Sequence, residues 1–218
     1  MTHPSLPNYL ALTSGSTHGI TDDQPPARHR VAGPSIFSQV SAAHGTWATY
    51  AESMSGRCAR VSTTLYAVKH NPAAYYTSLA STCSSADLPL GTPTSGPLIQ
   101  ALRTNRLPTF ALIVPNMCHD THDCSVSTGD AWLGTWLPRI LSSSAYQAGR
   151  TAVFITWDED DESHGNQVML LEVAPSVPPG WTLTGRVTHL NLLRTTEDML
   201  GLAALVPSAA SMRSAGRL

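Results

Sequence analysis

The sequence predicts an α/β fold with a mostly parallel sheet flanked by helices, and two observations predict it. The first is a set of compact apolar runs of strand length, and the second is a set of segments whose apolar residues recur at helical spacing. The runs are 108–115, 150–157 and 167–175, and the helical segments lie within 35–53, 128–146 and 188–202. Because strands that alternate with amphipathic helices form parallel sheets, we expect the three runs to lie in one sheet.

Turn residues and caps define the elements in chain order. A loop is predicted for the Pro-rich segment 22–35. A helix that stops at Gly45 is predicted for SIFSQVSAAHG, and a strand that leads into a loop is predicted for TWATYAES. Short helices are expected in PAAYYTSL and in LPLGTPTSGPLIQALR. Prolines bound the run 108–115, which indicates a buried strand. The helix within 128–146 is expected to start at a Thr or Asp cap, and the helix 188–202 to start at Thr188 and end near Gly201.

Length and composition restrict the class of protein. The chain has 218 residues, which predicts one domain spanning 1–218. A hydrophobic content of 42% and a charged content of 13% indicate an ordered, loop-rich protein. The formal net charge is -2 without a basic block, so nucleic acid is not an expected partner. No apolar run has the length of a membrane span, and residues 1–20 lack the pattern of a signal peptide.

The four cysteines predict disulfide bonds rather than a metal or redox motif. Their spacing fits neither a zinc ribbon nor a Cys-x-x-Cys motif. Four cysteines allow three pairings, and the simplest is Cys58–Cys83 with Cys118–Cys124. Disulfide bonds would place the protein in an oxidising compartment.

Polar side chains follow two of the apolar runs. PNMCHDTHDC follows the first run and contains Asn116, Asp120 and His122, which are oxygen and imidazole ligands suited to a divalent cation. The same residues also fit a solvated acidic loop closed by a disulfide bond. In an α/β sheet, functional side chains gather at the carboxyl ends of the strands, which favours a site here.

The second cluster, TWDEDDESHG, places two adjacent carboxylates, Asp158 and Glu159, directly after a strand. Such a run is often a solvated turn. Carboxylates at the end of a buried strand repel each other unless a cation compensates, so a metal site is favoured. Among the single histidines, His70 lies at a plausible pocket edge, whereas His3, His29 and His44 have no evident partner in the sequence.

The first residues, SLPNYLALTSGSTHGI, admit two interpretations. Pro, Gly, Ser and Asn form turns, so the stretch fits a polar entry loop. The alternative is a nucleophile segment, and it follows from a resemblance in the rest of the chain.

Four segments carry the resemblance, in chain order YAVKHNPAAYY, LPTFALIVPNMCHDTHDC, TAVFITWDE and THLNLLRTTEDMLGL. They resemble the bacterial phosphoesterase family that contains acid phosphatases and phospholipases C. This family is part of the alkaline phosphatase superfamily. The resemblance implies an alkaline-phosphatase-like parallel α/β core and a metal-assisted Ser or Thr nucleophile. It also implies a secreted or cell-envelope protein that acts on a small phosphate ester or a phospholipid.

The resemblance assigns roles to individual residues. The opening stretch is similar to the nucleophile segment of the superfamily's phosphodiesterases, and Ser5 falls on the nucleophile. A divalent cation at its oxygen would favour the alkoxide, and the helix that follows would direct its amino end at the phosphate. The implied metal ligands are Ser5, Asp158, Glu159, Asn116, Asp120 and His164, and the implied substrate-binding residues are His122, His70 and Asn8.

One departure from the family pattern concerns the first strand. The family begins with an apolar strand that ends in Glu-Asn and supplies metal ligands, and nothing before Thr2 matches it. We therefore expect an N-terminally truncated relative. Two functions follow: metal-dependent phosphate ester hydrolysis through a phosphoserine at Ser5, or a catalytically impaired remnant. A plain serine hydrolase is disfavoured because the chain lacks a Gly-x-Ser-x-Gly elbow.

Overall fold

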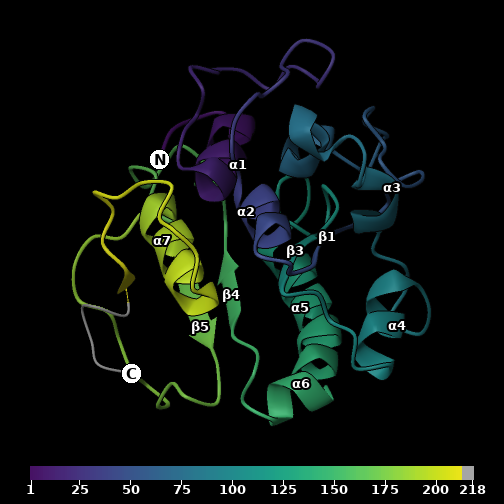
Figure 1. The fold of residues 1–218 in the computed structure, drawn as a ribbon, viewed down its shortest axis with the longest axis vertical. Helices are drawn as coiled ribbons and strands as arrows, with labels where there is room; N and C mark the ends of the chain where they lie inside the picture. The colour runs from purple at the N-terminus through teal and green to yellow at the C-terminus, as the bar shows by residue number, and fades with distance from the viewer. Residues whose placement is uncertain (213–218) are drawn as a thin grey trace.

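The chain folds into two small sheets and the helices that cover them (Figure 1). The structure, a computed structural model, describes residues 1–212. The helices of a full turn or more are α1 (Ser5–Ser14), α2 (Ile36–Ala42), α3 (Cys83–Ala86), α4 (Pro97–Arg103), α5 (Val126–Leu141), α6 (Ser144–Gln147) and α7 (His189–Leu200). Short 3₁₀ helices are η1 (Val68–His70), η2 (Pro72–Ala74) and η3 (Thr77–Leu79). The strands are β1 (Trp47–Ala51), β2 (Asp87–Pro89), β3 (Phe110–Val114), β4 (Val153–Thr156) and β5 (Leu170–Val173).

The larger sheet is parallel and is covered by helices on both faces. Its order is β2–β1–β3, with Thr49 opposite both Asp87 and Leu112. Alternate residues of the central strand β1 enter two cores, because successive side chains of a strand point to opposite faces. Trp47 packs into the core formed with α1, α2 and α7, and Tyr50 packs into the core formed with α4 and α5. This layering confirms the predicted fold class and is consistent with an alkaline-phosphatase-like core.

The prediction that 108–115, 150–157 and 167–175 share one parallel sheet is wrong. The first run is β3 in the parallel sheet, whereas β4 and β5 pair antiparallel in a separate two-stranded sheet. A parallel neighbour needs a crossover connection, usually a helix. Residues 157–169 contain no helix and form a polar loop, so the chain returns antiparallel.

The three runs are also less buried than predicted. β3 includes an exposed Ala111, and all four side chains of β4 are half-buried. Both strands have an edge that pairs with no other strand in the part of the chain that the structure describes. Apolar composition therefore identified the strands correctly but overstated how completely they are covered.

The helix predictions are largely confirmed. α2 ends before Gly45, and α7 begins at a Thr188 capping box and ends at Gly201 in the left-handed conformation. The expected cap of the helix within 128–146 is wrong, because α5 starts earlier, after Ser125. Residues 5–14, which could have been an entry loop, form the helix α1.

The structure contains both predicted disulfide bonds, Cys58–Cys83 and Cys118–Cys124. The second bond joins cysteines that are six positions apart, and the loop that it closes carries Asp120 and His122. Since a short covalent loop restricts the backbone, this bond limits where the two side chains can lie. Within residues 1–212, no helix combines the length and apolar character needed to cross a membrane.

A buried carboxyl group in the sheet predicts stability that falls as pH rises. Asp87 is fully buried in β2, and burial raises its pKa to about 6, although a hydrogen bond from Asn71 opposes the shift. The folded state therefore holds this proton at pH values where the unfolded state releases it. We expect stability to fall by about 3 kcal/mol between roughly pH 4 and pH 7 through this group.

Urea unfolding of the protein and of Asp87→Asn at pH 4 and pH 7 measures this contribution. The difference between the two pH values should shrink in Asp87→Asn, because the amide does not titrate. Asp130→Asn, which changes an exposed carboxylate on α5, is the matched control and should leave the difference intact. Equal pH dependence in Asp87→Asn and in the unaltered protein would contradict the prediction.

Candidate active site

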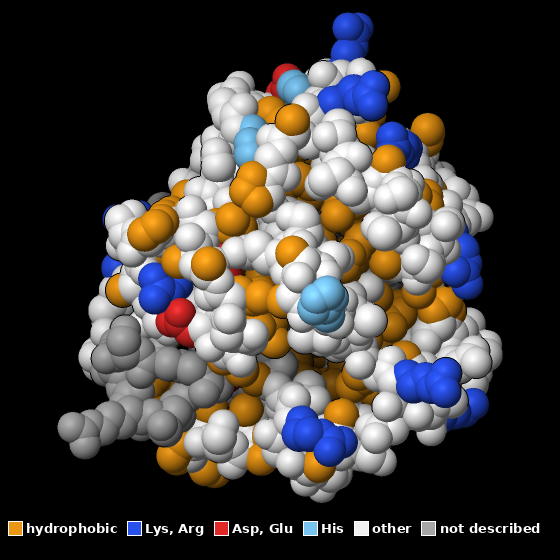
Figure 2. All heavy atoms as spheres, in the orientation of Figure 1, with side chains coloured by type: hydrophobic (Ala, Val, Ile, Leu, Met, Phe, Trp, Pro, Cys, Tyr) orange, Lys and Arg blue, Asp and Glu red, His pale blue; other side chains and the backbone are white. Residues whose placement is uncertain are grey.

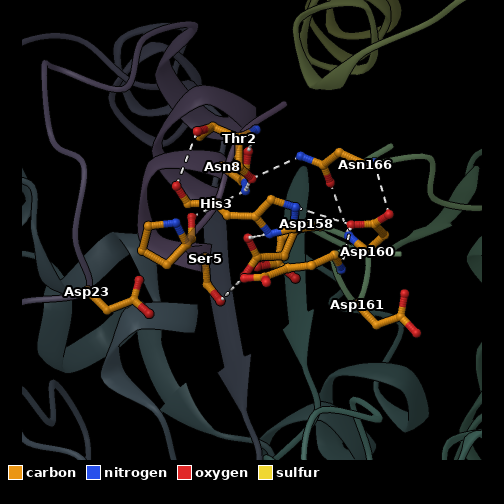
Figure 3. Close-up of polar contacts among 12 residues, drawn as sticks. Thr2, His3, Ser5, Asn8, Asp23, Asp158, Asp160, Asp161 and Asn166 are labelled. Carbon is orange, nitrogen blue, oxygen red and sulfur yellow. Dashed lines mark hydrogen bonds and ion pairs between the residues drawn. The ribbon is translucent and has the colours of Figure 1, made fainter. Parts of the chain in front are cut away.

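Ser5 lies at the start of α1, where its hydroxyl faces a carboxylate from a distant loop. It is 1% exposed, and its Oγ donates a hydrogen bond of 2.9 Å to Oε1 of Glu159. Glu159 belongs to the loop that follows β4, so the contact joins two segments separated by more than half of the chain. Figure 3 shows Ser5 directed at this loop from the helix start. The predicted pairing of Ser5 with the acidic segment is therefore present.

Two carboxylates lie side by side at this point. Burial raises the pKa of Glu159, and repulsion from Asp158 adds to the shift, while the hydrogen bond from Ser5 opposes it. Oδ2 of Asp158 is buried and accepts no hydrogen bond from any of residues 1–212. A buried carboxylate oxygen without a partner is costly unless a cation or a donor compensates. Asp158 and Glu159 are therefore the side chains here that could hold a cation.

His3 forms contacts with two acidic residues that the sequence analysis did not predict. Its Nδ1 lies 2.7 Å from Oε2 of Glu159, and its Nε2 lies 3.1 Å from Oδ1 of Asp160. The ring thus bridges two acidic side chains beside Ser5. Its position two residues before Ser5 was the available signal, but sequence alone does not show which distant residue a histidine faces.

His70 connects Ser5 to the loop that follows β3. Its Nε2 is 3.4 Å from Oγ of Ser5, and its Nδ1 is 3.2 Å from Oδ2 of Asp120. The imidazole is buried and stacks on Tyr9, with ring centroids 5.1 Å apart. Indole Nε1 of Trp157 donates to the Asp120 carbonyl oxygen at 2.9 Å, which ties this loop to the end of β4.

His122 and Lys69 place positive or polar groups at the rim of the site. Nζ of Lys69 lies 3.5 Å from Nε2 of His122 and 2.9 Å from Oδ2 of Asp23. Asp23 in turn accepts a hydrogen bond from the backbone N–H of Leu6. That contact occupies part of the amino end of α1, which the sequence analysis expected to face a phosphate. Neither Lys69 nor Asp23 was among the predicted site residues.

The side chains of two predicted site residues, Asn116 and Asn8, form hydrogen bonds that hold neighbouring segments of the chain. Asn116 donates to Ser53 and accepts from the N–H groups of Cys118 and His119, so its amide shapes its own loop. Asn8 holds the N-terminal segment through Thr2. None of these hydrogen bonds reaches Ser5.

His164 lies in the exposed loop after Glu159 rather than beside Ser5. With Asp160 and Asp161 it forms a group whose ligand atoms lie within 4.8 Å of one another. The side chain of Asp160 accepts hydrogen bonds from the backbone of Glu162, His164 and Asn166, which organises the loop. The contacts of His164 are with Ser163 and Asp161.

Comparison with known proteins extends these observations to most of the chain. The Phosphoesterase family matches residues 1–203. A phosphatidylinositol-3-phosphatase of Mycobacterium tuberculosis is 35% identical over 204 residues, which are 92% of this chain and 64% of that protein. An acid phosphatase of Aspergillus fumigatus is 28% identical over 222 residues, which are 94% of this chain and 47% of that protein. A phosphate-repressible acid phosphatase of Penicillium chrysogenum is 27% identical over 219 residues, 94% of this chain and 51% of that protein.

The chain spans about half to two thirds of the length of these curated relatives. The family match, by contrast, leaves only the last 15 of the 218 residues uncovered. Because the match covers far more than half of the chain, the chain belongs to the Phosphoesterase family.

Proposed function

We propose that this protein hydrolyses phosphate esters with Ser5 as the nucleophile, acting on a small phosphate ester or on the headgroup of a phospholipid. The observation that carries the proposal is the contact between the buried Ser5 hydroxyl and Glu159, beside the unpartnered carboxylate oxygen of Asp158. Family membership and relatives named as phosphatases support the same reaction class.

The proposed reaction has two halves. Oγ of Ser5 forms a bond to phosphorus, the bond from phosphorus to the ester oxygen breaks, and the alcohol leaves with a proton. Water then attacks the phosphoserine, releases inorganic phosphate and restores the hydroxyl. Glu159, which accepts the Ser5 hydrogen bond at 2.9 Å, is placed to orient the hydroxyl and hold its proton.

Ser5, Asp158 and Glu159 fit a divalent cation. The buried Oδ2 of Asp158 lacks a donor, and carboxylate and hydroxyl oxygens are ligands that hard cations prefer. When bound, such a cation favours the alkoxide of the nucleophile and offsets the charge of the phosphate. The identity of the cation and the roles of Asn116, Asp120 and His164 as further ligands stay predictions, and the local contacts of Asn116 favour a structural role.

His70 and His122 are proposed to contact the phosphate. Nε2 of His70 faces Ser5, so a phosphate attached to Ser5 would lie next to this ring. His122 and Lys69 lie at the rim, where a cationic group would attract an anionic substrate. The two disulfide bonds support a further proposal, that the protein works in an oxidising compartment such as the cell exterior or envelope.

Metal removal tests the proposed function. The purified chain is assayed with p-nitrophenyl phosphate and with bis(p-nitrophenyl) phosphate, before and after chelation, and then with Mg²⁺, Mn²⁺, Zn²⁺ or Ca²⁺ restored. We expect chelation to lower the rate at least about a hundredfold, because loss of the cation removes the charge that favours the Ser5 alkoxide and offsets the phosphate. At least one cation should restore it.

The two substrates separate monoester from diester preference. Hydrolysis that is indifferent to chelation would contradict the metal-dependent reaction. Stoichiometric binding of a cation without turnover of either ester would favour the catalytically impaired remnant instead.

A further inference from the structure

A polar pocket lies in the loop between α1 and α2, and Ser5 is not among its lining residues. It has a volume of about 350 Å³ and is lined by His18, Arg28, His29 and Arg30 over an apolar floor that includes Ile20 and Val31. Four of its lining side chains are thus arginine or histidine, in a chain whose formal net charge is -2. Figure 2 shows Lys or Arg and His side chains gathered at the top of the view, over this loop in Figure 1.

The two guanidinium groups of the pocket are not engaged by acidic side chains. Within residues 1–212, neither Arg28 nor Arg30 forms an ion pair, and their guanidinium groups donate no hydrogen bond. Arg194 pairs with Asp198, and the guanidinium groups of Arg57 and Arg139 donate to backbone carbonyl oxygens. Within residues 1–212, the exposed Arg106 and Arg150 are unpaired as well, but they do not line this pocket. Two unpaired guanidinium groups on one small pocket leave ten potential donors directed at no protein acceptor.

The backbone that carries these side chains is fixed at several points. Val31 donates to the carbonyl oxygen of Tyr75 and accepts from the N–H of Thr77, both at 3.0 Å, which attaches the pocket floor to the core. The N–H groups of Arg28 and His29 both donate to the Pro25 carbonyl oxygen.

The two histidines are also anchored. Nε2 of His18 contacts Oγ of Ser14 at 2.8 Å, and His29 forms an ion pair with Asp22. Arg28 and Arg30 are therefore presented by an anchored loop rather than by a free surface segment.

The guanidinium groups of Arg28 and Arg30 indicate what kind of ligand the pocket would bind. The planar fork of a guanidinium matches the oxygens of a phosphate, and two forks on one pocket bind such a group more tightly than a single charge does. The volume suits one phosphate with part of a small organic group attached. We propose that the pocket of Arg28 and Arg30 binds a phosphate group, at a site separate from Ser5.

Free phosphate and the phosphorylated headgroup of a larger molecule present the same chemistry to this pocket. Asp23, in the same loop, contacts the start of α1 and Lys69, so the loop joins the pocket to the surroundings of Ser5. The proposal itself does not depend on hydrolysis at Ser5, because it concerns binding alone.

Calorimetric titration of the full chain tests the proposal. The protein is kept in chelator and titrated with inorganic phosphate, with inositol 1,3-bisphosphate, and with vesicles of phosphatidylcholine that contain phosphatidylinositol 3-phosphate. Arg28→Ala/Arg30→Ala should weaken binding at least about tenfold, because charge-assisted hydrogen bonds are lost. Arg106→Ala/Arg150→Ala removes the same charge from exposed positions after α4 and α6 and should leave the affinity unchanged.

Binding of inorganic phosphate alone identifies the free anion as the ligand, and tighter binding of the bisphosphate or of the vesicles identifies a headgroup. Equal affinity in the unaltered protein and in Arg28→Ala/Arg30→Ala overturns the proposal, as does the absence of binding to all three probes. An equal loss in the control variant also overturns it, since it would show a general effect of charge. Failure of hydrolysis in the ester assay would leave these titrations unaffected.

Discussion

Replacement of Ser5 by alanine is expected to lower phosphate ester hydrolysis at least about a thousandfold, because the substitution removes the atom that forms the bond to phosphorus. The variant lacks the hydroxyl that donates to Glu159, but it keeps the carboxylates of Asp158 and Glu159. Binding of the activating cation should therefore fall much less than the rate. Steady-state assays with p-nitrophenyl phosphate and thermal unfolding with and without the cation measure the two effects.

The control for this variant is Ser41→Ala, which removes a hydroxyl on α2 that donates only within its own helix, to Phe37. Its rate should equal that of the unaltered protein. Mass spectrometry of the unaltered protein, quenched during turnover, should detect phosphate on the peptide that contains Ser5. An unchanged rate in Ser5→Ala would mean that this serine only begins the helix α1.

Parts of the candidate site follow elements that the sequence indicates, because Asp158 and Glu159 come directly after one apolar run and Asp120 follows another. The rule that functional side chains meet at strand ends holds for one parallel sheet, and β3 and β4 lie in different sheets. The hydrogen bond from Trp157 to the Asp120 carbonyl oxygen, rather than a shared sheet edge, connects the two loops. Ser5 could not be joined to them by any local pattern. Its role as a partner of Glu159 came from resemblance, and the hydrogen bond between them agrees with it.

The sequence did not predict which polar groups Asn116, His164 and His3 contact, because each side chain has several possible partners. Asn116 has the right type for a ligand, but backbone N–H groups two and three residues ahead lie within reach and take its side-chain oxygen. His164 lies in a loop whose shape is set by hydrogen bonds to Asp160, and that loop directs the ring to solvent. His3 was discounted because its acidic partners lie more than 150 residues away.

The separate β4–β5 sheet has a similar origin. Apolar composition identifies a strand but does not identify its neighbours, because backbone hydrogen bonds carry no residue-type signature. The polar loop 157–169 decided the pairing, since a connection without a helix returns the chain beside the strand it has just left.

Replacement of Asp158 by asparagine is expected to raise the stability of the cation-free protein and to weaken cation binding. In chelator, we expect the variant to be more stable than the unaltered protein by about 1 kcal/mol, because one of two adjacent, partly buried carboxylates is neutralised. Repulsion from Asp158 also raises the pKa of Glu159, so this pKa should move down toward its ordinary value in the variant. Functional sites keep charged groups that lower stability, whereas charges in a solvated turn cost little. A gain in stability in Asp158→Asn would therefore indicate a functional site.

With the cation present, the order should reverse. A bound cation stabilises the folded protein in proportion to the logarithm of its concentration over its dissociation constant, so the unaltered protein should melt at a higher temperature when the cation is added. Asp158→Asn should lose that thermal shift, because its affinity for the cation should be at least about a hundredfold weaker. Even substitutions of residues that only contact a metal's ligands lower metal affinity by about ten- to a hundredfold.

Asp161→Asn decides between the two places where a cation could bind. It removes the same charge from an exposed carboxylate of the group formed with Asp160 and His164. If the cation binds beside Ser5, Asp161→Asn keeps both the thermal shift and the ester hydrolysis while Asp158→Asn loses both. If instead Asp161→Asn abolishes the shift and Asp158→Asn retains it, the cation binds in the exposed loop, and Asp158 and Glu159 are not its ligands.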